Sequence, residues 1–105
     1  MSYLALLLWK QRRHDSSVAM YRQLLSIEKR LVGADSVNVA QHMCNLGGVL
    51  FDMQKYEDAL IELNQSHAIL LVMTKGRGEL FNLVVDLQNK CTAAIVERDT
   101  LAKKE

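Results

Sequence analysis

Apolar residues recur at every third or fourth position along most of this chain, which is the spacing that places them on one face of an α-helix. Proline is absent and only five glycines are present, so the chain has too few turn residues for a β-rich domain of its 105 residues. The pattern predicts an all-α fold. Between residues 18 and 32, the apolar face predicted to be buried consists of Val18, Tyr21, Leu24, Leu25, Ile27, Leu31 and Val32.

Five helices follow from this periodicity and from residues that can start or stop a helix. Asp15 or Ser16 offers a side-chain oxygen to cap the second helix, and Asp35 or Ser36 can cap the third. Gly33 closes the second helix, and Gly76 and Gly78 separate the fourth helix from the fifth. The predicted helices cover residues 2–13, from 15 or 16 to 32, 37–53, 56–73 and 79–102.

Short turns between these helices force neighbours to lie antiparallel, so a row of helical hairpins is expected. One domain, residues 1–105, would contain a short first hairpin (1–33), a second hairpin (36–74) and a closing helix (79–102). The pair Gly47 and Gly48 falls inside the third helix, where each glycine costs roughly 1 kcal/mol relative to alanine. Close approach of the fourth helix, with Ala59 and Ser66 as its small residues, would explain the pair.

The chain repeats itself after 42 residues. At this shift large residues fall on large ones and small on small, and such repetition indicates stacked hairpins that bury their apolar faces against each other. A shift of 41 extends the match into the last helix, where it aligns Leu46 with Leu87 and Leu50 with Cys91. The pairs aligned at 42 include Leu4 with Leu46, Ala5 with Gly47, Leu8 with Leu50, Trp9 with Phe51, Tyr21 with Leu63 and Ile27 with Ile69.

Residues 21–40 read YRQLLSIEKRLVGADSVNVA, and residues 45–51 and 54–60 read NLGGVLF and QKYEDAL. These stretches resemble the long-period tetratricopeptide repeats of kinesin light chains. The family often has prolines near Ala34 and Val37 and a glycine near Gln54, and this chain has neither. The resemblance implies an α-solenoid in which the first helix of each hairpin lines a groove for a partner peptide or helix.

By this resemblance, the groove would be lined by the first, third and fifth helices. Asn45 stands where the family commonly has an asparagine that holds a ligand backbone, a task that suits a carboxamide because it both donates and accepts hydrogen bonds. A solvated helix amide is the alternative. Trp9 would be an aromatic anchor, or else it packs under the next hairpin as Phe51 would. The predicted partner-binding residues are Trp9, Gln41, Asn45, Asp52, Asn82, Asp86 and Asn89.

Charge and titratable residues argue against other classes of function. The net charge is +1, and the one dense basic cluster, Lys10, Arg12 and Arg13, is interpreted as a solvated turn, so no nucleic acid is expected. The three histidines are widely separated and show no metal-ligand or catalytic spacing. We therefore predict no enzymatic activity, no metal and no cofactor.

Cys44 and Cys91 form no C-x-x-C pair, so they are expected to be small buried groups of a protein in a reducing compartment. The cytoplasm is the predicted location. A mitochondrial presequence is the alternative, since no acidic residue precedes Asp15. No apolar run is long enough to span a membrane.

The expected function is a non-catalytic scaffold that binds a partner protein or peptide in the groove. A small architectural subunit, embedded permanently in a large complex, is the alternative. The first helix begins partway through a full repeat helix and carries Leu6, Leu7, Leu8 and Trp9 without a polar capping face. We expect either that the chain is a fragment of a longer solenoid, or that this end self-associates or is covered by a partner.

Overall fold

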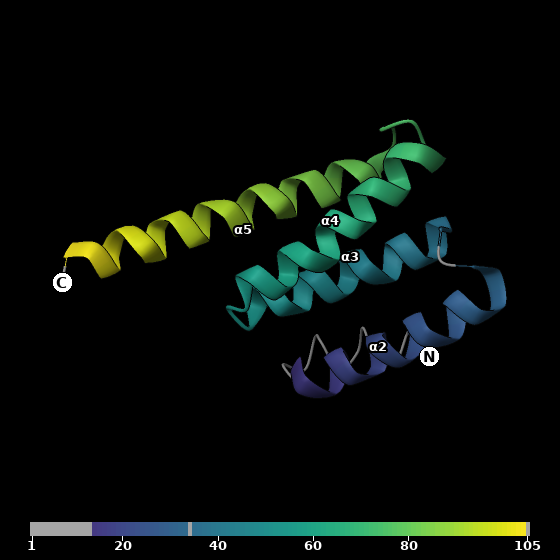
Figure 1. The fold of residues 1–105 in the computed structure, drawn as a ribbon, viewed down its shortest axis with the longest axis horizontal. Coiled ribbons are helices and arrows are strands. Elements are labelled where there is room, and N and C mark those ends of the chain that lie inside the picture. Colours follow the sequence, from purple (N-terminus) through teal and green to yellow (C-terminus); the bar gives the residue numbers. More distant parts are fainter. Residues whose placement is uncertain (1–13, 34, 105) are drawn as a thin grey trace.

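The computed structural model describes residues 14–33 and 35–104, so the predicted helix over residues 2–13 lies outside the described residues. In the described part, four α-helices follow one another through short turns (Figure 1). Successive helices run antiparallel, which confirms the predicted all-α row of helical hairpins. The helices are α2 (His14–Val32), α3 (Val37–Asp52), α4 (Tyr56–Met73) and α5 (Glu79–Lys104).

Local capping chemistry sets the turn between α2 and α3. Gly33 has φ +92° and donates its N–H to the carbonyl of Lys29 at 3.2 Å, which ends α2 in the left-handed conformation that glycine adopts easily. The hydroxyl of Ser36 accepts the N–H of Val39 at 3.1 Å and caps α3 as predicted. The predicted cap of α2 at Asp15 or Ser16 is wrong, because α2 already includes His14.

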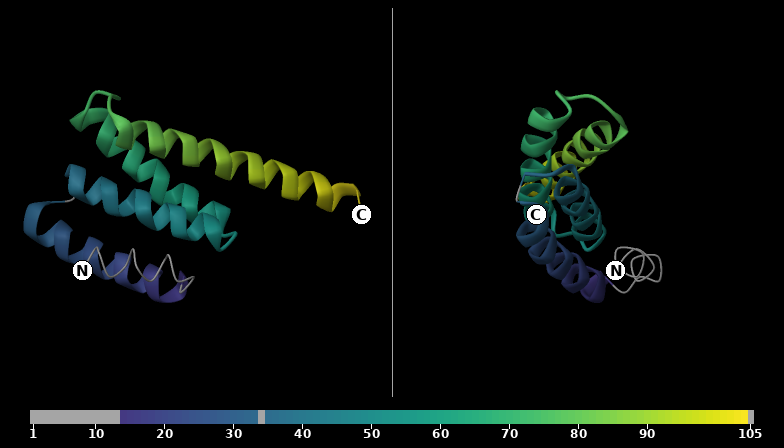
Figure 2. Two further views of the ribbon diagram at one scale, coloured as in Figure 1. Left: turned by 180° about the vertical axis from the view of Figure 1, so that it is seen from behind. Right: turned by 90° about the vertical axis from the view of Figure 1, so that its right-hand side faces the viewer.

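The centre of the described fold is α3, which contacts α2, α4 and α5. Ten of its sixteen residues are buried, whereas each neighbour buries one side only. Seen from the end of the molecule, α2 and α4 lie along one side, and α3 and α5 lie along the other (Figure 2). The fully buried side chains that join these helices include Tyr21, Leu46, Val49, Leu63, Leu70 and Val84.

The closest helix contact lies between α3 and α4, as the glycine pair predicts. A Cβ atom placed on Gly47 would lie 2.7 Å from Cγ of Leu63, a separation that real side chains do not adopt. Nearby, the buried hydroxyl of Ser66 donates to the carbonyl of Ala40 at 2.7 Å. Ala59 is fully buried on the same helix. Small residues therefore let the two backbones approach each other.

The end of α2 departs from its predicted core face. Leu31 and Val32 are 75% and 54% exposed, although their spacing predicts burial. The buried residues of α2 lie earlier, from Ser17 to Leu25, and no described element covers its last turn. Periodicity identifies the face of a helix, but it does not say how far along that face the neighbouring helix extends.

A strained residue connects α3 to α4. Gln54 has φ +63°, and this conformation lets the N–H of Lys55 reach the carbonyl of Leu50 at 2.9 Å. A side chain in the left-handed region costs roughly 1–2 kcal/mol, a cost that glycine avoids. The turn therefore satisfies the Leu50 carbonyl at the end of α3, but it holds Gln54 in a backbone conformation that is unfavourable for a residue with a side chain.

We expect Gln54→Gly to raise the free energy of unfolding by about 1 kcal/mol, because the gain in the native turn exceeds the entropy that glycine adds to the unfolded chain. Urea unfolding followed by circular dichroism measures the change. Gln23→Gly, at an exposed position inside α2, is the matched control and should lower stability by about 1 kcal/mol. A loss of stability in both variants would contradict the strain at Gln54.

We expect Gly47→Ala to lower the free energy of unfolding by about 1–3 kcal/mol, because the added methyl group must push Leu63 out of place. The larger Gly47→Leu should unfold the chain. A double-mutant cycle with Leu63→Ala checks the cause, since the two changes together should cost less than their sum. Additive losses would show that the contact does not limit how closely α3 and α4 pack.

Candidate functional site

A pocket of about 270 Å³ opens between α3, the first helix of the central hairpin, and the closing helix α5. Its walls are mainly apolar, and polar side chains stand at its edge. Pockets of this composition bind an apolar group while a few polar contacts fix its orientation. The pocket is lined by Cys44, Asn45, Gly48, Phe51, Asp52, Leu83, Leu87 and Lys90.

The α3 wall contains two of the predicted site residues. Asn45, Gly48 and Asp52 are three and four positions apart, so they form one stripe along the helix. Asn45 is half-buried and Asp52 is exposed, which leaves the carboxamide within reach of a bound chain. Gln41 is exposed on the same helix but does not line the pocket. Trp9 lies outside the described residues.

The α5 wall consists of Leu83, Leu87 and Lys90, none of which is among the predicted site residues. A helix turns about 100° per residue, so the predicted set lies on the neighbouring, exposed stripe of α5. One member of that set remains connected to the pocket, because Asp86 forms an ion pair with Lys90 at 3.1 Å. The predicted α5 residues that do not line the pocket are Asn82, Asp86 and Asn89.

The internal repeat could have predicted which α5 residues line the pocket. Shifting Gln41, Asn45 and Gly48 by 42 residues gives Leu83, Leu87 and Lys90, whereas the shift of 41 gives the exposed stripe. The shift of 41 does align the buried positions, since Leu50 and its counterpart Cys91 are both buried. No single shift aligns both the buried and the pocket-lining positions of α5 with those of α3.

Polar contacts between α4 and α5 fix the position of the α5 wall. The ring nitrogen Nδ1 of His67 lies 2.9 Å from Oε1 of Gln88, whose amide nitrogen donates to Oδ1 of Asn64 at 2.8 Å. Since Gln88 Oε1 can only accept, His67 donates from Nδ1. The His67 ring also packs edge-on against Phe81, at 4.8 Å between centroids. These contacts align α5 along α4.

The thiol of Cys44, which lines the pocket, is buried and protonated. Cys44 is almost fully buried, and this burial raises its pKa to about 11, so the group stays protonated at neutral pH. Among residues 14–33 and 35–104, no three His, Cys, Asp or Glu side chains gather in a way that could hold a metal ion. The apolar walls of the pocket can therefore accommodate an apolar group.

A row of antiparallel helical hairpins followed by a closing helix defines an α-solenoid fold. The family model described as "Tetratricopeptide repeat" matches residues 1–71, and the chain belongs to this family. The match ends within α4, so α5 and its pocket wall lie beyond it. No curated protein and no solved structure matches this chain. None of the described helices is long and apolar enough to cross a membrane.

His42, buried on α3 with no hydrogen-bond partner for Nδ1, should make folding depend on pH. Desolvation lowers its pKa below 6.5, and the nearby charge of Glu28 opposes this only in part. The unfolded chain therefore binds the proton more readily than the folded chain. The stability that comes from the neutral ring is fully present above about pH 6.5 and is lost as the pH falls from there towards the lowered pKa.

We expect the urea midpoint to fall between about pH 7 and pH 5 in the wild-type chain, and to fall less steeply in His42→Gln. Gln41→Ala, which changes an exposed and non-titrating neighbour on α3, is the control and should retain the wild-type slope. Equal slopes in the wild-type chain and in His42→Gln would assign the pH dependence to other groups.

Proposed function

We propose that this chain is a non-catalytic interaction module that binds an extended segment or a helix of a partner protein in the groove between α3 and α5. The single observation that carries the proposal is the pocket between these helices, with apolar walls and Asn45 at its edge. Tetratricopeptide repeats generally mediate contacts between proteins, which supports a protein partner.

Each wall of the pocket would contribute a different kind of contact. Leu83 and Leu87 present apolar surface from α5, and Leu83 is 47% exposed, so it loses water when a partner covers it. The carboxamide of Asn45 can donate to and accept from a peptide unit of any sequence. Lys90 adds a cation at the far edge, held beside Asp86. Affinity would come mainly from the apolar wall and orientation from the polar edge.

A second candidate is an architectural subunit of a larger assembly. The described residues expose ten large apolar side chains, and exposed apolar surface often marks a permanent interface. Tandem purification followed by mass spectrometry separates the two functions. A single stoichiometric complex would favour the architectural subunit, and several substoichiometric partners would favour the groove-binding module.

We expect Asn45→Ala to weaken peptide binding about tenfold while leaving the melting temperature nearly unchanged, because the half-buried carboxamide serves the ligand more than the core. The probe is a peptide selected against the wild-type chain from a random display library, and its affinity is measured by fluorescence anisotropy. Gln41→Ala, which changes an exposed α3 residue outside the pocket lining, is the matched control and should bind normally.

Leu87→Arg places a charged side chain inside the pocket, so it should abolish binding of the same peptide. Circular dichroism of each variant verifies that the helices remain folded. Selected peptides that bind Leu87→Arg and the wild-type chain equally well would show that the groove is not the binding site.

A further inference from the structure

The second helix of the central hairpin, α4, is apolar on two opposite sides. Its inner side packs into the core through Ala59, Leu63 and Leu70. Its outer side exposes Ile61 and Val72, which are 55% and 75% accessible. A surface helix normally has a polar outer face, and a helix that is apolar all round is normally covered on both sides. The outer side of α4 therefore has the character of an interface.

The 42-residue repeat does not predict an apolar outer face for α4. The residues of α2 that stand 42 positions before Ile61, Ala68 and Val72 are Ala19, Ser26 and Arg30. Both helices take the same place in their hairpins and lie on the same side of the molecule (Figure 2). Since the equivalent face of α2 is small and polar, the apolar face of α4 is a particular property of this helix.

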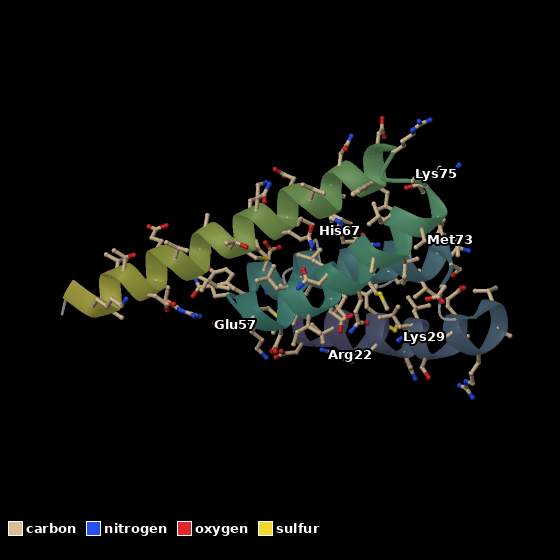
Figure 3. All side chains as sticks on the ribbon, turned by 45° about the horizontal axis from the view of Figure 1, so that its top comes forward. Arg22, Lys29, Glu57, His67, Met73 and Lys75 are labelled. Atoms are coloured by element: carbon tan, nitrogen blue, oxygen red, sulfur yellow. The ribbon has the colours of Figure 1, made fainter. Side chains whose placement is uncertain are left out.

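The exposed positions form a seam along the outer side of α4. The members within α4 are separated by three, four, three and four residues, which is the spacing of a coiled-coil contact. The last member, Lys75, follows the helix in the α4–α5 turn with φ +57°, so the turn and not the helix period sets its position (Figure 3). The α4 seam consists of Asp58, Ile61, Gln65, Ala68, Val72 and Lys75.

We propose that the α4 seam binds the α4 seam of a second copy of this chain, with the two helices antiparallel about a two-fold axis. In such an interface, contacts between unlike residues occur twice. Ile61 meets Val72 of the second copy at each end of the apolar stretch, and Gln65 meets Ala68 at the centre. The same arrangement brings Asp58 next to the turn of the second copy that carries Lys75, so each end of the seam closes with an ion pair.

Charge supports a second copy as the occupant. The helix contains three carboxylates and no lysine or arginine. Two carboxylates are already paired within the chain, Glu57 with Arg98 and Glu62 with Arg22. Within the described part of the chain, Asp58 and Lys75 form no salt bridge. The unpaired acid and the unpaired base therefore stand at opposite ends of the seam, where an antiparallel copy neutralises both.

The predicted dimer is weak and leaves the binding groove open. Ile61 and Val72 are about 17 Å apart along the helix at 1.5 Å per residue, so a single helix pair provides a small interface. We expect a dissociation constant on the order of 10–100 µM. The groove between α3 and α5 lies on the other side of the molecule (Figure 2), so this association is independent of the proposed peptide binding.

The register of the proposed dimer can be tested by reversing single charges and then mixing the two variants. Asp58→Lys alone opposes two lysines at each end of the seam, and Lys75→Asp alone opposes two aspartates. Each variant should therefore self-associate at least about fivefold more weakly than the wild-type chain. In an equimolar mixture of the two variants, every lysine faces an aspartate again. Sedimentation velocity over a concentration series should then give a mixed dimer with nearly wild-type affinity.

Two further variants locate the interface. Ile61→Asp places a charge in the apolar stretch and should make the chain monomeric, whereas Leu83→Asp, in the groove, should leave the dimer intact. Circular dichroism shows whether each variant is folded. The proposal is overturned if the wild-type chain is monomeric at millimolar concentration. It is also overturned if Ile61→Asp self-associates normally, because association would then belong to another part of the chain, such as residues 1–13. A third contradicting outcome is an equimolar mixture of the two charge-reversal variants that does not regain the wild-type affinity.

Discussion

The structure depends on the absence of a side chain at Gly47. There, α3 and α4 approach so closely that a single methyl group would collide with Leu63, and the hydroxyl of Ser66 reaches the α3 backbone. Such proximity lets both helices bury continuous apolar surface in the hairpin, and it gives α3 the central position from which it contacts α2 and α5 as well. The groove and the α4 seam are the two free sides of this one hairpin.

The two walls of the pocket are held in position by different contacts. Asn45 and Gly48 belong to α3 and are fixed directly by the α3–α4 contact. The α5 wall is fixed through α4, where Val84 and Cys91 are fully buried and Gln88 bonds to both Asn64 and His67. Exposed links such as the Arg98–Glu57 pair add little stability. Apolar burial therefore holds α5 in place, and the polar contacts select its rotation.

The sequence was sufficient to predict the hairpins because their signals are local or exactly periodic. Ser36 and Gly33 act within one turn of the chain, and the glycine pair has a cost that only a neighbouring helix explains. Leu31 and Asn82 illustrate what such signals leave undetermined. The exposure of Leu31 depends on where the covering element begins, and the position of Asn82 outside the pocket depends on the rotation of α5. Both are relations between helices, and no period within one helix encodes them.

The two free sides of the central hairpin have different chemistry, and this difference matters for how the module would work. The groove combines apolar walls with a carboxamide and suits a partner segment that binds reversibly. The α4 seam, in contrast, is self-complementary and suits a second copy of the chain. A pair of chains joined by their seams carries two grooves. A partner with two binding segments then gains affinity from the local concentration of the second groove, provided that its linker spans the distance. Because a short seam dissociates easily, this gain depends on the concentration of the chain, and abundance would set the strength of binding.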